Sequence, residues 1–200
     1  MALDLRRGGN LAGMQKYADE LERACDRARA ADPSDPEPYY HRGRILRARM
    51  RFDDARRSQE EAVQRRPDHA DARYELLLLD ARRLHDRLDR LFAEALRKEG
   101  ARLAAAGAGE EIRTPDLRRV LEGDAVAREA ARRLATEAEW LSMRADLPGA
   151  QRACAAAFGA MAVRDLDRAR RLFEETVEGF PGLEEAYESA GGFEKEEKHF

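Results

Sequence analysis

Histidine, the side chain that most often moves protons and binds metal ions near neutral pH, is scarce in this chain of 200 residues. The four histidines are His41, His69, His85 and His199. None of them has a Cys, Asp or Glu at the spacing of a known metal-binding pattern such as H-E-x-x-H. We therefore expect this protein to bind no metal ion.

The other residue patterns that could carry out chemistry have ordinary structural explanations. The Gly-Ala-Gly segment at 107–109 follows no strand-like window and has no G-K-[ST] after it, so it does not match a phosphate-binding loop. Neighbouring carboxylates such as Glu60 and Glu61 are typical of a solvated helix face, and nothing in the pattern marks them as an acid–base pair. The sequence thus predicts no enzymatic activity and no cofactor.

The composition indicates a surface that carries charges of both signs. Charged residues make up 38% of the chain, and 37 basic and 40 acidic residues leave a formal net charge of −3. Because the two signs are interleaved instead of forming one basic stripe, we expect no nucleic-acid partner. Nearly all the basic residues are Arg and Ala is abundant, which favours a bacterial source with a GC-rich genome.

No segment has the pattern of a membrane span or a secretory signal. The leucine run at residues 76–79 is far shorter than a bilayer span, and the first ten residues contain no apolar core. Cys25 and Cys154 lie far apart in helical, partly apolar contexts, which favours two buried free thiols in a reducing compartment. We therefore expect a cytoplasmic protein without a membrane partner.

Small and helix-breaking residues recur along the chain with a period of 34 residues. The three pairs are Gly9 and Gly43, Ala28 and Ala62, and Pro33 and Pro67. Gly and Ala allow two helices to approach closely, and Pro stops a helix because it lacks a backbone donor and clashes with the previous turn. This period indicates repeated pairs of antiparallel helices.

The clearest repeat covers residues 36–69. Its first helix is predicted over residues 37–49 and its second over residues 54–66, joined by a turn in which Asp53 caps the second helix. We expect the two helices to approach each other most closely at Gly43, where a side chain would clash.

This repeat resembles the tetratricopeptide repeat. The residues that carry the resemblance are Tyr39, Gly43, Leu46, Ala55, Ala62 and Pro67. Two positions depart from that pattern, since Arg42 stands where Leu is usual and Gln59 stands where an aromatic residue is usual. The resemblance implies an all-α fold of antiparallel helix hairpins, stacked as a short tetratricopeptide-like α-solenoid.

The preceding segment, residues 2–35, matches the same pattern less well. Its first-helix positions are filled by Leu5, Gly9 and Ala12, and its second-helix positions by Leu21, Cys25 and Ala28. Because Asn10 and Gly13 disfavour helix, we expect regular helix only from about Leu11, with the partner helix frayed or missing.

Beyond residue 69 the repeat pattern gives way to one long helix. It is predicted over residues 70–99, where no Gly or Pro interrupts the apolar periodicity, and a turn near His85 and Asp86 is the alternative. Helix resumes where Thr114 could act as N-cap and Pro115 as the first helical residue.

Three more helices are predicted near the C-terminus, over about 124–144, 145–163 and 164–179, and another begins in 183–189. The last two of the three have the form of a repeat over residues 150–182. The predicted organisation is therefore 1–100 for N-terminal repeats running into the long helix, 101–114 for a loop, 115–190 for C-terminal repeat-like helices and 191–200 for a polar tail.

The resemblance also implies where a partner would bind, because first-helix residues line the inner groove of such repeats. The candidate groove residues are Glu37, Tyr40, Arg44, Arg47, Asp71, Tyr74 and Leu78. Tyr and Arg are frequent binding anchors, and two Arg one turn apart could grip a carboxylate of a peptide. Alternatively, the two tyrosines shield the junction between repeats and the two arginines are solvated charge.

These observations favour a non-catalytic scaffold that binds a peptide or protein partner in its concave groove. Two alternatives stay open. One is a structural module that forms homo-oligomers through residues 70–99, with Leu84 and Leu91 at the interface. The other is an accessory repeat domain of a larger bacterial signalling protein.

Overall fold

In a computed structural model of the chain, which describes residues 2–106 and 115–181, every regular element is an α-helix. The helices belong to two compact units, Met1–Leu76 and Leu77–Phe200. The predicted all-α class of antiparallel helix hairpins with one long helix is confirmed. Within the described residues, no helix combines the length and the apolar character that crossing a membrane requires.

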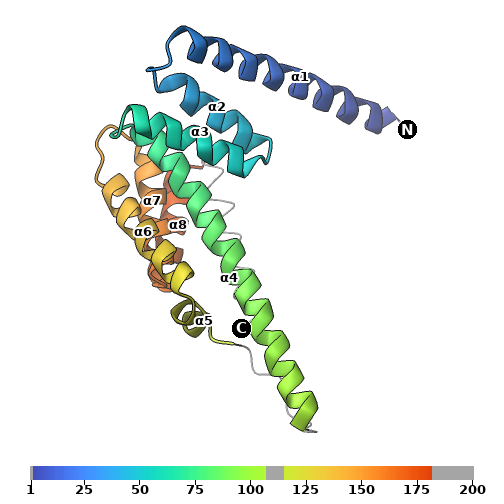
Figure 1. Cartoon of the computed structure of the whole chain (residues 1–200), viewed down its shortest axis with the longest axis vertical. Coiled ribbons are helices and arrows are strands. Elements are labelled where there is room, and N and C mark those ends of the chain that lie inside the picture. Colours follow the sequence, from blue (N-terminus) through green and yellow to red (C-terminus); the bar gives the residue numbers. More distant parts are fainter. Residues whose placement is uncertain (1, 107–114, 182–200) are drawn as a thin grey trace. The chain divides into compact units, whose positions relative to one another are not determined.

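The first unit is built around a hairpin of α2 (Glu37–Ala48) and α3 (Phe52–Arg65), which lie side by side (Figure 1). Met50 occupies the turn with a φ of 60°, and the backbone N–H of Arg51 donates to the carbonyl of Leu46 at 2.9 Å. The left-handed conformation of Met50 reverses the chain and lets the N–H of Arg51 bond to one of the last carbonyls of α2. The predicted cap by Asp53 is wrong, because α3 already begins at Phe52 and Asp53 lies inside its first turn.

The predicted close approach at Gly43 is confirmed. A Cβ atom at this position would lie 2.3 Å from Nε2 of Gln59, so only Gly lets α2 and α3 pack at this distance. Gln59 is fully buried, and its amide donates to the backbone carbonyl of Tyr40 at 3.1 Å. The amide side chain therefore replaces the usual aromatic residue by bonding to the backbone across the hairpin.

The N-terminal segment forms a single helix, α1 (Ala2–Ala31), and α1 lies against α2. The prediction of regular helix only from Leu11, after a break near Asn10 and Gly13, is therefore wrong. Each Gly in a helix costs about 1 kcal/mol relative to Ala, whereas Pro, which costs about 3 kcal/mol, is absent until Pro33. The helix-forming neighbours outweigh the glycines, so the 30-residue helix continues through them.

The long helix is also continuous. α4 (Ala70–Ala106) has 37 residues, covers the predicted residues 70–99 and contains no turn at His85 or Asp86. At 1.5 Å per residue, 37 residues correspond to a length of about 55 Å.

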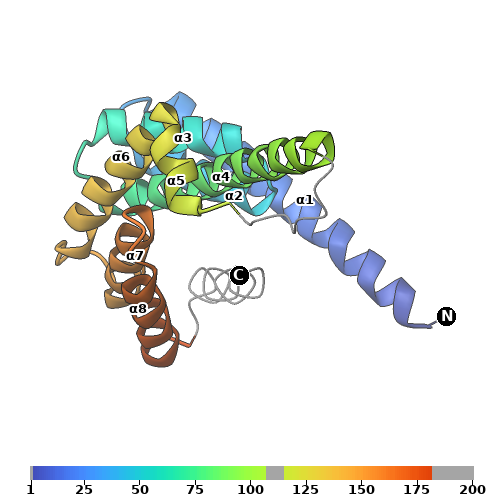
Figure 2. The ribbon, with the colours of Figure 1, turned by 90° about the horizontal axis from the view of Figure 1, so that it is seen from below.

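Among its described residues, the second unit contains four further helices, α5 (Leu117–Gly123), α6 (Ala125–Ser142), α7 (Gly149–Ala162) and α8 (Leu166–Gly179). α6 packs against α7, and α7 and α8 form a hairpin (Figure 2). The three predicted helices of this region are therefore present, and α8 ends before Pro181 as expected.

Aspartates begin three of these helices. Asp116, Asp124 and Asp165 accept bonds from backbone N–H groups in the first turns of α5, α6 and α8. The prediction of Pro115 as a first helical residue is wrong, because α5 begins at Leu117. The predictions for Thr114, 107–109, 183–189, 191–200 and His199 lie outside the described residues.

Asp124 also joins α6 to α4. The guanidinium of Arg87 binds both of its carboxylate oxygens, at 2.9 and 2.8 Å, while the N–H of Ala127 donates to Oδ1 at 2.7 Å. The bonds from Arg87, followed by that from Ala127, lower the pKa of Asp124 to about 2. Within the second unit, α4 and α6 are thus joined by a carboxylate that stays ionised at neutral and mildly acidic pH.

Candidate functional site

The predicted groove residues lie on α2 and on the first turns of α4. Spacings of three and four residues place Glu37, Tyr40, Arg44 and Arg47 on one side of α2. Asp71 and Tyr74 belong to the part of α4 in the first unit, whereas Leu78 is a half-buried residue of the second unit.

Arg44 and Arg47 converge on one carboxylate, that of Glu75. Nε of Arg47 lies 2.8 Å from Oε2 of Glu75, and Nε of Arg44 lies 3.6 Å from Oε1. The Glu75 side chain is only 7% exposed, whereas the Arg44 side chain is 55% exposed. The carboxylate that we expected these arginines to take from a partner is therefore supplied by the chain itself.

Sequence reasoning missed Glu75, although a signal was present. Glu75 directly precedes the apolar run of residues 76–79, and a carboxylate beside such a run needs a partner if it is buried. The arginines that satisfy it are 28 and 31 residues away, at Arg47 and Arg44, so only the folded chain brings the three groups together.

Tyr40 and Tyr74 are both buried, at 9% and 2% exposure. The Tyr40 ring packs against the rings of His41 and His69, with centroid distances of 5.0 and 5.1 Å, and the Arg44 guanidinium lies 5.8 Å from its centroid. Burial raises the pKa of the Tyr40 phenol. The two rings thus fill the core of the first unit and offer little surface of their own.

His69 forms the junction between α3 and α4. Its Nδ1 accepts a bond from the N–H of Ala72 at 3.5 Å, which caps α4, and its Nε2 lies 3.6 Å from Oε1 of Glu37. Burial is the main cause that lowers the pKa of His69, followed by the positive charge of Arg66. A neutral ring is required here, because a protonated Nδ1 could not accept the bond from Ala72.

Glu37 and Asp71 complete the predicted set. Glu37 accepts a bond from Nη2 of Arg66 at 2.8 Å and lies 4.0 Å from Nε2 of His41. Asp71 is half-buried in the first turn of α4. The Arg44 side chain is more exposed than those of Glu37 and Arg47, and Arg44 lies farther from Glu75 than Arg47 does.

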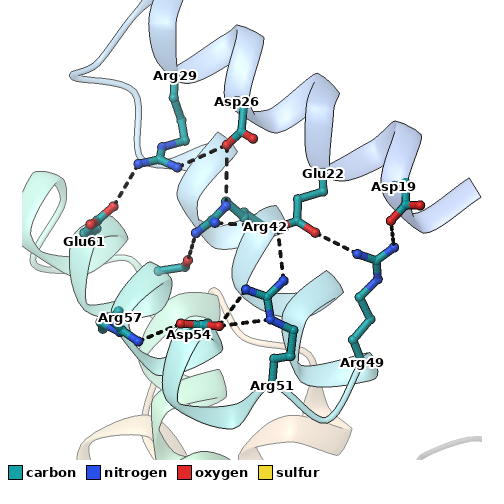
Figure 3. Close-up of polar contacts among 11 residues, drawn as sticks. Asp19, Glu22, Asp26, Arg29, Arg42, Arg49, Arg51, Asp54, Arg57 and Glu61 are labelled. Atoms are coloured by element: carbon teal, nitrogen blue, oxygen red, sulfur yellow. Dashed lines mark hydrogen bonds and ion pairs between the residues drawn. The ribbon is translucent and has the colours of Figure 1, made fainter. Parts of the chain in front are cut away.

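A second charged cluster, the α1 ion-pair network, joins α1 to the α2–α3 hairpin (Figure 3). Its acidic members on α1 are Asp19, Glu22 and Asp26, and its basic members on the hairpin are Arg42, Arg49 and Arg51. The Glu22 side chain is mostly buried and lies at the centre of the network.

Glu22 is approached by guanidinium groups from α2 and from the turn that follows it. Arg49 Nη1 donates to Oε2 of Glu22 at 2.8 Å, while Arg42 Nη2 and Arg51 Nη1 lie 3.6 and 3.7 Å from Oε1. Arg42 also donates to Oγ of Ser58 at 2.9 Å. The unusual Arg42 therefore has a structural role, because it ties α3 to the acidic side of α1.

The cysteines and the possible metal ligands form no joint site among the described residues. Among them, no group of three or more His, Cys, Asp or Glu side chains is placed to hold a metal ion. Cys25 and Cys154 form no disulfide. Burial is the main cause that raises the pKa of Cys25, helped by the charge of Asp26, so its thiol is not activated as a nucleophile.

Comparison with known proteins identifies no family for this chain. No protein-family model matches the chain, and no curated protein matches it. Among solved structures, the chain is similar to YrrB, described as a TPR protein with an unusual peptide-binding site. That likeness covers 90% of this chain and 88% of the other at 17% identity, with a TM-score of 0.29, and it assigns neither a family nor a function.

Proposed function

We propose that this chain is a non-catalytic interaction module that binds a carboxylate-bearing peptide or protein along the face of α2 that carries Arg44. The observation that supports this is the unequal pairing of two arginines with Glu75. Arg47 contacts the buried carboxylate at 2.8 Å, whereas the half-exposed Arg44 stays 3.6 Å from it.

The two arginines can therefore have different roles. Arg47 keeps the buried Glu75 paired, which a carboxylate removed from water requires. Arg44 can turn toward an acidic group of a partner without leaving Glu75 unpaired, since Arg47 remains. A guanidinium binds a carboxylate with two parallel bonds, which gives direction as well as attraction.

The position of Arg44 fits the resemblance to tetratricopeptide repeats. In such repeats the first helix of each hairpin lines the groove, and α2 is the first helix of the α2–α3 hairpin. The buried rings of Tyr40 and Tyr74 then act as the floor that holds the charged residues in place, rather than as anchors that a partner touches.

The test is a selection of binding peptides from a displayed library on the full chain, followed by affinity measurements with variants. Arg44→Gln should weaken the selected peptides about 10- to 100-fold, because a charge-assisted hydrogen bond contributes roughly 1.5–3 kcal/mol. The matched control is Arg57→Gln, an exposed arginine of α3 that pairs with the nearby Asp54. Its affinity should stay within about twofold of the parent.

Two outcomes would contradict the proposal. One is a library that yields no binding peptide at all, and the other is a set of peptides that binds Arg44→Gln as tightly as the parent chain. Arg47→Gln is not a suitable probe, because loss of Arg47 would leave Glu75 buried with a weaker partner and disturb the fold.

Self-association through α4 has no comparable support. Leu84 is buried within the second unit and Leu91 is half-buried there, so the substitution Leu84→Asp would test the core of that unit and not an interface.

A further inference from the structure

One side of α1 carries apolar residues with the spacing of a helix–helix contact and is left open to solvent. The residues, named here the α1 seam, are Tyr17, Leu21, Ala24, Ala28 and Ala31. They follow one another at intervals of 4, 3, 4 and 3 residues, the repeat of a two-helix coiled coil. All five are exposed, and Tyr17 and Leu21 are 63% and 37% exposed.

The corresponding side of α3 is covered by neighbouring helices, whereas this side of α1 is not. Residues 34 positions further on, in α3, are Ala55, Ser58 and Ala62, and all three are buried. Their counterparts Leu21, Ala24 and Ala28 are exposed, because α1 runs straight through the segment that would otherwise fold back as a hairpin partner. The same register that buries one face of α3 therefore leaves the corresponding face of α1 uncovered.

A different side of α1 is already in contact with α2 and its arginines. Glu22 and Arg29 are partly buried on that side, and the contacts there include ion pairs and the stacking of Arg29 over the Tyr39 ring. The seam lies about a quarter turn away, since each residue advances a helix by roughly 100°. A second helix can therefore reach the seam without displacing the α1 ion-pair network.

Charges beside the seam are self-complementary. Glu20 and Arg27 lie seven residues apart on the edge of the seam that faces away from α2, and both are exposed. In an antiparallel pair of α1 helices centred near Ala24, Glu20 of each copy faces Arg27 of the other. Edge charges of this kind select the partner and its direction.

The sizes of the seam residues favour the same arrangement. An antiparallel pair places the large Tyr17 opposite Ala31 and the large Leu21 opposite Ala28, which gives an even distance between the helices. A parallel pair would crowd the large side chains at one end and leave small ones facing each other at the other end.

We propose that the α1 seam is the interface of a homodimer in which the α1 helices of two copies pack antiparallel. The contact involves about four turns of one helix from each copy, so it belongs with small interfaces and forms a weak, concentration-dependent dimer. This dimer leaves the α2 face with Arg44 available, so it is independent of the proposed function.

Sedimentation velocity of the full chain over a concentration series tests the interface. The parent chain should shift from monomer to dimer as its concentration rises. Leu21→Asp should weaken dimerisation about 100-fold or more, because each dimer would bury two unpaired carboxylates. Its helical circular dichroism should not change, since Leu21 is exposed in the single chain. The matched control is Val126→Asp, another exposed apolar helix residue, which should dimerise like the parent.

Charge exchange tests the orientation. Glu20→Arg should weaken the dimer about 3- to 30-fold, because two exposed ion pairs become repulsive contacts, and adding Arg27→Glu should restore it. Oxidative cross-linking gives a second readout in a Cys25→Ser background. Tyr17→Cys mixed with Ala31→Cys should cross-link, whereas Tyr17→Cys alone should not.

Several results would overturn this inference. A chain that stays monomeric at all concentrations has no such interface, and a dimer that survives Leu21→Asp uses another surface. Efficient cross-linking of Tyr17→Cys with itself would establish a parallel pair in place of the antiparallel one.

Discussion

The hairpins α2–α3 in the first unit and α7–α8 in the second reverse the chain with the same turn. Met50 and Arg164 both adopt the left-handed conformation, with φ of 60° and 61°. In each turn the next residue donates its N–H to a carbonyl five residues earlier, Arg51 to Leu46 at 2.9 Å and Asp165 to Ala160 at 3.0 Å. The backbone of this motif therefore does not depend on which side chain occupies the left-handed position.

The two hairpins differ in what lies between their helices. When the two turn residues Met50 and Arg164 are aligned, each residue of the first hairpin corresponds to the residue 114 positions later in the second, since 164 − 50 = 114. Gly43 and Gln59 of the first hairpin correspond to Ala157 and Phe173 of the second, and all but Gly43 carry fully or almost fully buried side chains. Phe173 packs edge-on against Phe158, with a centroid distance of 5.2 Å.

The same hairpin backbone therefore accommodates two different kinds of side-chain packing between its helices. In the second hairpin an aromatic ring supplies apolar area, which is the larger source of stability. In the first hairpin Gly43 makes room for an amide that bonds to the carbonyl of Tyr40. A buried amide stabilises little beyond replacing its bonds to water, so the first hairpin depends on fit and the second on apolar burial.

The largest effect should come from removing the aromatic ring of the second hairpin. Phe173→Ala should lower the free energy of unfolding of the second unit by about 3–5 kcal/mol, because it leaves a cavity in a packed core. Urea unfolding followed by Trp140 fluorescence measures this, since Trp140 is the only tryptophan and lies in α6. Phe180→Ala is the control, because that ring is partly exposed, and it should cost much less. Equal losses for both would show that Phe173 is not the main source of apolar stability.

The next effect concerns the fit of the first hairpin. Gly43→Ala should destabilise the first unit by about 1–3 kcal/mol, although Ala favours helix, because its methyl group would overlap the buried Gln59 amide. Hydrogen exchange of peptides from α2 and α3 measures this loss. Adding Gln59→Ala should recover part of it, so the double variant should be more stable than the sum of the single losses predicts. Additive losses would contradict a direct clash between these residues.

Most of this helical architecture could be predicted from the sequence because its breaks coincide with Pro, Gly and Asp. The bounds of α2, α3, α7 and α8 follow from Pro67, Pro181 and the apolar spacing within a few residues. The exception is α1, where Gly9 and Gly13 suggested a break. A helix tolerates several glycines when the neighbouring residues favour helix, because the helix propensities of the whole segment add up and a single Gly does not decide the result.

The candidate surface could be predicted only in part. Helical spacing brought Arg44 and Arg47 to one face of α2, but their common partner Glu75 comes from another helix. Arg42 stood out only as a departure from a pattern, until the acidic groups of α1 gave it partners. Ion pairs between distant segments depend on how whole helices pack against each other. The spacing of residues along a single sequence does not show this packing.

A smaller effect is expected from the reciprocal change in the second hairpin. Ala157→Gly should cost about 1 kcal/mol, mainly through the greater backbone freedom of Gly in the unfolded chain. The loss should appear as a lower urea midpoint by Trp140 fluorescence. A gain in stability would mean that α7 and α8, like α2 and α3, pack more closely with Gly at this position.

The smallest effect should come from the shared turn. A non-Gly residue in the left-handed conformation carries roughly 1–2 kcal/mol of strain, and part of the relief on changing it to Gly is lost to the unfolded chain. Met50→Gly should therefore stabilise the first unit by about 0.5–1 kcal/mol, since the Met50 side chain is exposed. Arg164→Gly should gain less, because the half-buried Arg164 side chain also gives up its contacts. Hydrogen exchange of α2 and α3 peptides reports the first change and Trp140 fluorescence the second. A loss of stability in both variants would show that these side chains, and not the backbone bonds, hold the two turns.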